Sequence, residues 1–195
     1  MRLPINCTVD YIKDFLTHKE SNELYVLLIN QYQIDQARII IEAGGRLTQT
    51  DSFKILFLTD ELKDQKSHPE EIHGQTFAFK GKMLELKKKV EQLLKKEFDL
   101  AMCLYYPDGN YFAPYHSDQE TSGCNTILPS ISLGAVREFS FRANTGDECY
   151  NLKLANGSLI IMGAYCQSRY THSLVKNQKC AQGRINITFR ERNFQ

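Results

Sequence analysis

The sequence predicts an α+β protein whose β part is a double-stranded β-helix, or jelly roll, with N-terminal helices packed on the outside of the sheet. Two observations predict this class. Apolar residues recur at helical spacing in the first half of the chain, whereas short apolar runs separated by turn residues fill the second half. Many short strands that follow helices are typical of a double-sheet arrangement combined with a helical layer.

Length and composition favour a single domain over residues 1–195. The chain is 42% hydrophobic, which is enough for one substantial core. It has 24 Lys plus Arg and 23 Asp plus Glu. The resulting net charge of +1 neither supports nor excludes nucleic acid as a partner.

The N-terminal residues and the cysteines indicate a compartment. Charged residues precede any long apolar run, so neither a secretory signal nor a membrane span is visible. The six cysteines are widely spread and form no C-x-x-C pair. We therefore expect an intracellular monomer, cytoplasmic or nuclear, with reduced thiols rather than disulfides and no membrane attachment.

Residues 1–46 carry apolar residues at helical spacing, which predicts one or two helices packed outside a sheet. These residues are Tyr11, Ile12, Phe15, Leu16, Leu24, Leu27 and Leu28. Strands are predicted over residues 53–58 and 76–79. The polar stretch between them, residues 60–75, is predicted to be a loop that is either a rim or lid or a solvated connection.

Gly81 precedes the clearest helix of the chain. Its apolar stripe consists of Met83, Leu86, Val90, Leu93 and Leu94. Its lysines are either the solvated face of the helix or contacts for phosphates. Beyond the helix the sequence predicts strands over residues 100–106, 127–134, 138–142, 152–154, 159–162 and 185–190.

A candidate metal site begins at His116. In a strand, side chains two residues apart share a face, so His116 and Asp118 would project together. A third imidazole from a separate strand would complete a two-histidine, one-carboxylate set that leaves Fe(II) three open positions, and His172 is the candidate. Each of these residues alone would more commonly be a packed or solvated side chain.

Residues 184–190 alternate strictly between polar and apolar side chains. Arg184, Asn186, Thr188 and Arg190 share one face of this predicted strand. Burying two arginines and an amide is costly unless an anion meets them. The planar fork of arginine matches a carboxylate, so the pattern predicts a cavity for a small dicarboxylic acid beside the metal.

An ordered set of motifs runs through the second half of the chain. It comprises Y-P-D-G at 106–109, H-S-D-Q-E at 116–120, S-I-S-L-G at 130–134, R-E-F at 137–139, G-S-L at 157–159, H-S-L at 172–174 and R-I-N-I-T-F-R at 184–190. A lone H-x-D is common by chance, but the ordered set is far more specific. It resembles the AlkB family of Fe(II)- and 2-oxoglutarate-dependent dioxygenases, which act with O2.

The resemblance implies a role for each matched residue. Those that would bind Fe(II) are His116, Asp118 and His172. Those that would bind 2-oxoglutarate are Tyr106, Arg184, Asn186 and Arg190. Within this second group, Arg184 would pair with the distal carboxylate, and Arg190 would lie near Asp118 as a further catalytic residue. Residues 1–99 would then be helical support with a possible substrate lid, and residues 100–195 the catalytic jelly-roll core.

One position departs from the family pattern. Family members often carry Asn two residues before the tyrosine, where this chain has Leu104. The change removes one hydrogen bond to the co-substrate, a loss of about 1 kcal/mol that weakens binding without abolishing the site.

The resemblance also implies a substrate. AlkB-type enzymes commonly oxidise an N-methyl group on a nucleobase of DNA or RNA, such as 1-methyladenine or 3-methylcytosine, and release formaldehyde, succinate and CO2. A base that leaves its stack needs aromatic faces and polar edge contacts. The candidate substrate residues are Glu120 and Tyr170. Further aromatic residues that are either core or stacking surfaces are Phe53, Tyr111, Phe112, Tyr115 and Tyr165.

Two alternatives stay open. The first is a related 2-oxoglutarate oxygenase that acts on a protein or a small molecule. The second is a binding module that keeps the fold without catalysis, against which the intact metal and arginine residues argue. The sequence does not decide between DNA and RNA or between methyl lesions.

Overall fold

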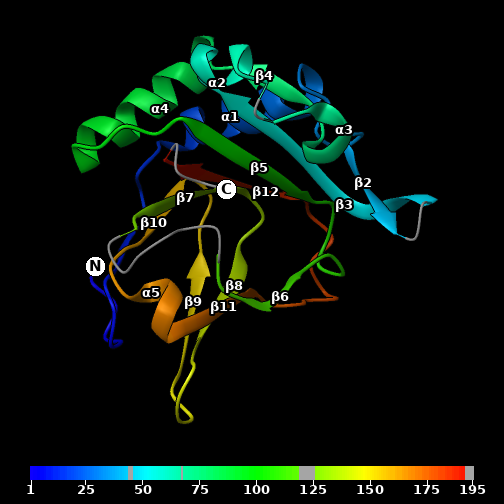
Figure 1. Ribbon diagram of the computed structural model, residues 1–195. Coiled ribbons are helices and arrows are strands. Elements are labelled where there is room, and N and C mark those ends of the chain that lie inside the picture. Colours follow the sequence, from blue (N-terminus) through cyan, green and yellow to red (C-terminus); the bar gives the residue numbers. More distant parts are fainter. Residues whose placement is uncertain (44–45, 67, 119–125, 192–195) are drawn as a thin grey trace.

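A large β-sheet forms the centre of the computed structural model, which describes residues 1–43, 46–66, 68–118 and 126–191 (Figure 1). Eight strands of this larger sheet lie in the described residues. In order across the sheet they are β1 (Val9–Ile12), β10 (Ser158–Met162), β7 (Leu128–Gly134), β12 (Arg184–Arg190), β5 (Leu100–Tyr106), β3 (Arg46–Leu58) and β2 (Arg38–Ala43), with β4 (Thr76–Ala78) beside β3. Only the β3–β4 pair among these is parallel.

A smaller antiparallel sheet faces the larger one. Its strands, in order, are β6 (Ala113–His116), β11 (Tyr170–Leu174), β8 (Arg137–Ala143) and β9 (Cys149–Leu154). Side chains from both sheets meet in a common core that contains Leu128, Ile160 and Met162 from the larger sheet and Phe141, Leu152 and Leu154 from the smaller. Two facing sheets of this kind confirm the predicted jelly roll.

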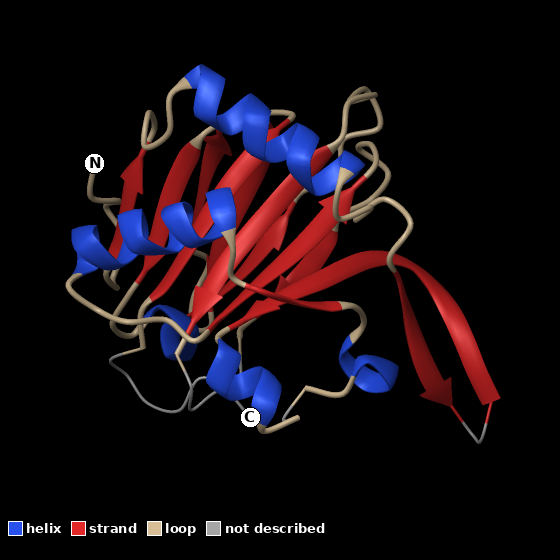
Figure 2. Ribbon diagram, turned by 90° about the horizontal axis from the view of Figure 1, so that it is seen from above, coloured by secondary structure: helices blue, strands red, loops and turns tan. Residues whose placement is uncertain are grey.

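Helices α1 (His18–Asn30) and α4 (Gly81–Leu94) cover the outer face of the larger sheet, as the view from above shows (Figure 2). A capping box starts α1, in which the Glu20 amide donates to Thr17 Oγ1 at 3.2 Å and the Thr17 amide donates to the Glu20 carboxylate at 2.7 Å. The predicted stripe of α4 is buried at Met83, Leu86 and Val90. The outer helices therefore lie where the sequence predicts them.

Lysines of α4 form ion pairs with carboxylates of the two outer helices. Lys87 lies 2.7 Å from Glu91, and Lys89 lies 3.0 Å from Glu20 of α1. These carboxylates already neutralise the two lysines. This pairing argues against phosphate contacts for the two lysines, of which Lys87 is itself only 14% exposed.

Side chains of strand β12 alternate between the two faces of the larger sheet. Ile185, Ile187 and Phe189 are fully buried in the core beneath the helices. The alternating residues Arg184 and Arg190 face the smaller sheet, together with the polar residues between them. The period-two pattern thus predicts both faces of this strand.

The helical prediction for residues 1–46 is wrong in two places. Residues 9–12 form β1 and residues 38–43 form β2, on either side of α1. Tyr11 and Ile12 belong to β1, which pairs with β10 from the far end of the chain. This long-range pairing overrides the local helical spacing, and residues 1–99 contribute strands to the larger sheet as well as helices.

Two further differences concern short elements. The predicted loop over residues 60–75 contains the helices α2 (Asp60–Asp64) and α3 (Glu70–His73). The sequence places His116 and His172 on strands but gives these strands, β6 and β11, no bounds, because runs of 4 and 5 residues show too little periodicity. Since β6 ends at His116, Asp118 lies two residues beyond the strand rather than on it.

Candidate active site

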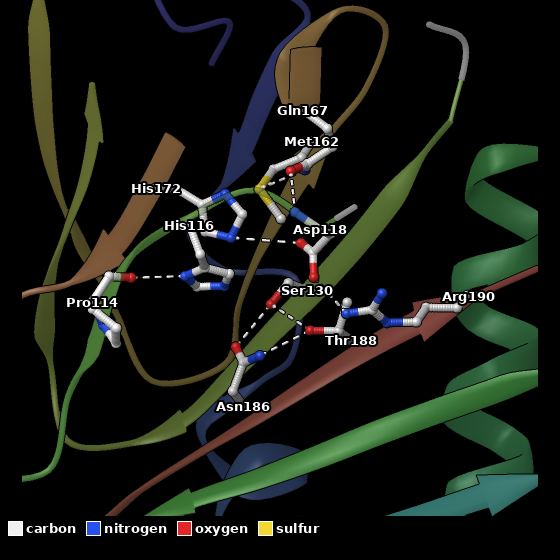
Figure 3. Close-up of polar contacts among 10 residues, drawn as sticks. All are labelled: Pro114, His116, Asp118, Ser130, Met162, Gln167, His172, Asn186, Thr188 and Arg190. Carbon is white, nitrogen blue, oxygen red and sulfur yellow. Dashed lines mark hydrogen bonds and ion pairs between the residues drawn. The ribbon is translucent and has the colours of Figure 1, made fainter. Parts of the chain in front are cut away.

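Two histidines face each other across the β6–β11 ladder. His116 and His172 are paired in register, and their ring centroids lie 4.4 Å apart. Asp118 follows the end of β6 and turns back towards them (Figure 3). The potential ligand atoms of the three residues all lie within 4.8 Å of one another. The structure therefore brings together one carboxylate and two imidazoles as a group that could hold a metal ion.

His116 and Asp118 are each oriented by a contact with a residue outside this group. His116 Nδ1 lies 2.7 Å from the carbonyl oxygen of Pro114, so Nδ1 carries the proton and Nε2 is left to face the metal position. His172 Nε2 lies 3.5 Å from Asp118 Oδ2. The Asp118 amide donates to Gln167 Oε1 of helix α5 (Cys166–Arg169) at 2.9 Å.

The protonation states of the group suit metal binding. Burial lowers the pKa of His172 to about 4, although the charge of Asp118 opposes this shift, so the imidazole is neutral at neutral pH. Burial raises the pKa of Asp118, but the charge of Arg190 outweighs it, together with the charge that His172 gains in acid, and this pKa lies below its ordinary value. The site thus presents a neutral imidazole and a carboxylate.

A row of polar side chains on β12 forms the opposite wall. Arg184 Nη2 donates to Ser132 Oγ at 2.9 Å and to Asn186 Oδ1 at 3.0 Å. The side-chain Nδ2 of Asn186 donates to Thr188 Oγ1 at 2.8 Å. Ser130 and Ser132 lie on the adjacent strand β7, in register with β12. These contacts fix the position of the guanidinium and the amide before any ligand arrives.

Arg184 is a buried cation without a carboxylate partner among the described residues. It is 1% exposed, and its Nε atom has no hydrogen-bond partner in the described part of the chain. Burial lowers its pKa to about 10, partly offset by Tyr106, whose ring lies 5.6 Å from the guanidinium carbon. An unpaired buried guanidinium is costly, and a small anionic ligand would compensate it.

One cavity connects the metal group to this wall. It is lined by Met102, Leu104, Tyr106, Ala113, His116, Asp118, Ser130, Phe139, Met162, His172, Leu174, Arg184, Asn186, Thr188 and Arg190. Its polar groups are the donors and ligands for a divalent cation and an anion, and its other walls are apolar. The residues present therefore fit Fe(II) together with a dicarboxylic acid.

The structure does not bring Tyr170 into this cavity. The Tyr170 side chain is 2% exposed and packs in the core between the sheets, where its hydroxyl donates to Glu148 at 2.8 Å and accepts from the Asn6 amide at 2.9 Å. The assignment of Tyr170 as a substrate contact is corrected for this reason. Glu120 lies outside the described residues.

The remaining aromatic candidates lie in three different environments. Tyr115 lies on the outer face of the smaller sheet, since its hydroxyl is 2.7 Å from Ser140 Oγ and its ring is 3.8 Å from the Arg142 guanidinium carbon. Tyr111 lies 6.1 Å from Phe53, measured between ring centroids. The most exposed candidates are Phe112 at 47% and Tyr165 at 44%.

Sequence reasoning missed Arg137 and Gln167 as supports of the site. Arg137 is 1% exposed and donates to the carbonyls of Asp108 at 3.0 Å, Tyr111 at 3.0 Å and Val175 at 2.8 Å. It thereby holds the loop between β5 and β6, which connects the two walls. The R-E-F motif contains Arg137, but no pattern in the sequence marks Gln167.

Comparison with known proteins identifies the family. The family model described as the 2OG-Fe(II) oxygenase superfamily matches residues 8–190, so the chain belongs to this family. Its curated relatives include alpha-ketoglutarate-dependent dioxygenase alkB homolog 3 of Mus musculus, 32% identical over 115 residues, and DNA oxidative demethylase ALKBH2 of Bos taurus, 26% identical over 137 residues. These relatives confirm the AlkB-type resemblance, and with it Fe(II), 2-oxoglutarate and O2 as the cofactor set.

The similarity has a defined extent. The mouse match covers 54% of this chain and 40% of the relative, and the cow match covers 60% and 49%. A third relative, uncharacterized protein R406 of Acanthamoeba polyphaga mimivirus, is 34% identical over 107 residues, which are 54% of this chain and 56% of that protein. The chain therefore spans about half the length of the curated relatives it matches.

Solved structures support the fold over nearly the whole chain. The structure of OsALKBH1 has a TM-score of 0.64 at 16% identity and covers 97% of this chain and 100% of that chain. A prolyl hydroxylase from Trichoplax adhaerens has a TM-score of 0.62 at 13% identity, covering 93% and 81%. Both likenesses concern the fold alone. Among the described residues, no helix is long and apolar enough to cross a membrane.

Proposed function

We propose that this chain is an Fe(II)- and 2-oxoglutarate-dependent dioxygenase that oxidatively demethylates N-alkylated nucleobases, of the 1-methyladenine or 3-methylcytosine type, in DNA or RNA. The residues that would hold Fe(II) are His116, Asp118 and His172. The residues that would hold 2-oxoglutarate are Tyr106, Arg184, Asn186 and Arg190. The products would be succinate, CO2, formaldehyde and the unmodified base.

The observation that carries the proposal is the position of Arg184. Its guanidinium is buried, is oriented by Ser132 and Asn186, and lines the same cavity as the His116, Asp118 and His172 group. A metal group alone would also suit a structural or hydrolytic site. A buried guanidinium without a carboxylate partner in the described residues, on the wall opposite the metal group, is specific for an anionic co-substrate that reaches the metal.

The roles of the residues follow from their contacts. Bound Fe(II) supplies the chemistry that couples decarboxylation of 2-oxoglutarate to oxidation of a C–H bond. Arg184 orients the co-substrate by pairing with its distal carboxylate. Arg190 keeps Asp118 ionised and aimed at the metal position, since its Nη2 atom donates to Asp118 Oδ1 at 2.6 Å. The apolar walls formed by Met102 and Phe139 exclude water from the reacting groups.

The names of the relatives support the substrate class, since ALKBH2 of Bos taurus is called a DNA oxidative demethylase. Surface residues near the loop between β5 and β6 are compatible with it. Phe112 is 47% exposed, and the Lys176 ammonium lies 5.9 Å from its ring centroid. An exposed aromatic ring beside a cation offers a base a face for stacking and a phosphate a counter-charge.

The test is an assay for succinate and formaldehyde. The protein is reconstituted anaerobically with Fe(II), and O2 is then admitted with 2-oxoglutarate and single- or double-stranded oligonucleotides that carry 1-methyladenine or 3-methylcytosine. Release of both products in equal amounts supports the proposal. His172→Ala should abolish both by removing a metal ligand, and full activity in this variant would refute the metal assignment.

The same assay separates the alternatives. Succinate release that no methylated oligonucleotide stimulates, without formaldehyde, would point to a protein or small-molecule substrate. Binding supplies an independent criterion, because phosphate contacts must weaken as the salt concentration rises. Salt-insensitive binding of the oligonucleotides would contradict a nucleic-acid substrate. Neither product, with Fe(II) and 2-oxoglutarate bound, would indicate a non-catalytic binding module.

A further inference from the structure

The N-terminal segment, residues 6–8, lies directly against the chain that leads into α5. The Thr8 amide donates to the carbonyl of Ala164 at 3.0 Å, and the Gly163 amide donates to the carbonyl of Thr8 at 2.7 Å. A Cβ atom at Gly163 would lie 3.1 Å from Thr8 Cγ2, so these two segments of the chain are in contact without space for a side chain between them. Further along, the Arg169 guanidinium donates to the Asn6 carbonyl at 3.0 Å.

This junction brings two cysteines together. Cys166 at the start of α5 is 1% exposed and belongs to the core between the sheets, and Cys7 is partly buried against the same core. Cys7 directly precedes Thr8, whose amide and carbonyl bind Ala164 and Gly163 just before Cys166, and each thiol is the largest influence on the pKa of the other. Both are free thiols. Among the other described cysteines, Cys149 instead contacts oxygen atoms, with Ser140 Oγ at 3.3 Å.

We propose that Cys7 and Cys166 form a redox-sensitive pair that hydroperoxides convert to an intramolecular disulfide between the N-terminal segment and α5. No metal ligand takes part in this bond. The proposal therefore goes beyond the proposed dioxygenase function and does not require it.

The two thiols have different roles in the reaction. The pKa of the Cys7 thiol is lowered, and its largest cause is the hydrogen bond from Cys166. The positive charge of Arg169 lowers this pKa further, whereas burial and the negative charge of Glu148 raise it. The hydrogen bond to Cys7 and burial raise the pKa of Cys166. Cys7 is also the more exposed of the two. The peroxide therefore reacts first at Cys7.

The reaction balances with the peroxide as oxidant. The Cys7 sulfur attacks one peroxide oxygen, the O–O bond breaks, and Cys7 sulfenic acid and one water form from hydrogen peroxide. The Cys166 sulfur then attacks the Cys7 sulfur, so the S–S bond forms and the S–O bond breaks. The departing hydroxide takes the Cys166 proton and leaves as a second water. The two thiols lose two electrons, which reduce the peroxide.

The effect of the disulfide would reach the metal site through Gln167, the residue of α5 that follows Cys166. A disulfide holds two sulfurs at about 2.05 Å, closer than two thiols in van der Waals contact, so its formation draws the start of α5 towards Cys7. Gln167 accepts the hydrogen bond of the Asp118 amide at 2.9 Å. Displacing this partner would loosen Asp118, and outer partners of metal ligands change metal affinity about tenfold or more. This consequence, unlike the disulfide, rests on the proposed function.

The disulfide is tested on the reduced, metal-free protein treated with one equivalent of hydrogen peroxide. We expect the free thiols to fall from six to four, since two of the six cysteines are consumed. Intact mass should fall by two hydrogen atoms, and peptide mapping should join Cys7 to Cys166 until dithiothreitol is added. Mapping that joins other cysteines, or leaves both of these open to alkylation, would overturn the proposal.

Matched variants separate the pair from general thiol oxidation. Cys149→Ser removes an exposed thiol on β9 and should leave the disulfide unchanged. Cys7→Ser should prevent it. Because Cys7 is only partly buried, this variant is less disruptive than a change at the buried Cys166, as a thermal melt of the reduced protein can verify. A two-hydrogen mass loss that persists in Cys7→Ser would refute the assignment. Oxidised protein should also melt at a higher temperature than reduced protein, because the cross-link restrains the unfolded chain.

The coupling to Asp118 has its own readout. Calorimetric titration with Mn²⁺ compares oxidised and reduced protein in the absence of 2-oxoglutarate and nucleic acid. We expect the oxidised form to bind about tenfold more weakly, and dithiothreitol to restore the affinity. Equal affinities would overturn the coupling. If neither form bound Mn²⁺, the failure would lie with the proposed metal site, because the thiol count and the mapping do not involve metal.

Discussion

Arg190 Nη2 and Asp118 Oδ1 meet at 2.6 Å, with side chains that are 2% and 12% exposed. This contact joins β12, the last strand in the sequence, to the residues that follow β6. It places a permanent positive charge behind the carboxylate of the metal group. Because Arg190 also lines the cavity, one residue contributes both to the fold and to the site.

Replacing Arg190 by methionine should leave the Asp118 carboxylate buried without this partner. Removing one member of a buried pair costs about 3–5 kcal/mol, so we expect Arg190→Met to lower the free energy of unfolding of the metal-free protein by about that amount. Urea denaturation measures it. Arg142→Met on the outer face of β8 is the control and should change stability by less than about 1 kcal/mol. Equal effects of the two variants would refute the structural role of the pair.

Arg184→Lys tests the co-substrate wall. Lysine keeps the charge but cannot reproduce the two-point contact of a guanidinium with a carboxylate. We expect the KM for 2-oxoglutarate to rise about 30-fold or more, which corresponds to about 2 kcal/mol. The fold should be intact, as circular dichroism can check. A KM equal to that of the unaltered protein would mean that the co-substrate carboxylate binds elsewhere.

Leu104→Asn should strengthen co-substrate binding. Leu104 lines the cavity and pairs with Asn186 in the β5–β12 ladder, so an amide at this position can reach the same ligand. One net hydrogen bond of about 1 kcal/mol lowers the KM for 2-oxoglutarate about fivefold. Leu104→Met, which keeps an apolar side chain, is the matched control. A KM that rises in the asparagine variant would contradict this placement of the ligand.

The capping box of α1 makes stability depend on pH. Hydrogen bonds from the Thr17 backbone, from Lys89 and from the Thr17 hydroxyl lower the pKa of Glu20 to about 2. A lowered carboxyl pKa stabilises the fold above the unfolded pKa of about 4.3, and this contribution is lost as the pH falls towards the folded pKa.

We therefore expect Glu20→Gln to lower the free energy of unfolding by about 1 kcal/mol at pH 7. This magnitude is small because Glu20 is 44% exposed and solvent screens its ion pair. The difference from the unaltered protein should shrink as the pH falls from about 4.3 towards 2. Glu97→Gln, at an exposed position, is the control. A difference that stays constant down to pH 2 would rule out the ionised capping box as its cause.

Strong periodicity made part of the fold predictable from sequence. The alternation along residues 184–190 predicts both faces of β12, and the stripe at Met83, Leu86 and Val90 predicts the buried side of α4. Both patterns extend over whole elements, so local sequence and tertiary packing agree. Tyr11 and Ile12 show the opposite case, because a partner strand from the other end of the chain determines their structure.

The candidate site was predictable in composition but not in detail. The spacing of His116 and Asp118 indicates that they act together, yet Asp118 lies beyond the strand and is oriented by Gln167 and Arg190. For a tyrosine close in sequence to a metal ligand, no sequence pattern shows whether its side chain faces the cavity or the core. Tyr170 is of the second kind, with its hydroxyl held by Glu148.

The most direct test of the central claim is mass spectrometry of an oligonucleotide that carries one 1-methyladenine. We predict that the methyl group is lost only when Fe(II), 2-oxoglutarate and O2 are all present, and that Asp118→Ala abolishes the loss. A methylated oligonucleotide that stays intact while the protein converts 2-oxoglutarate to succinate would contradict the proposed substrate.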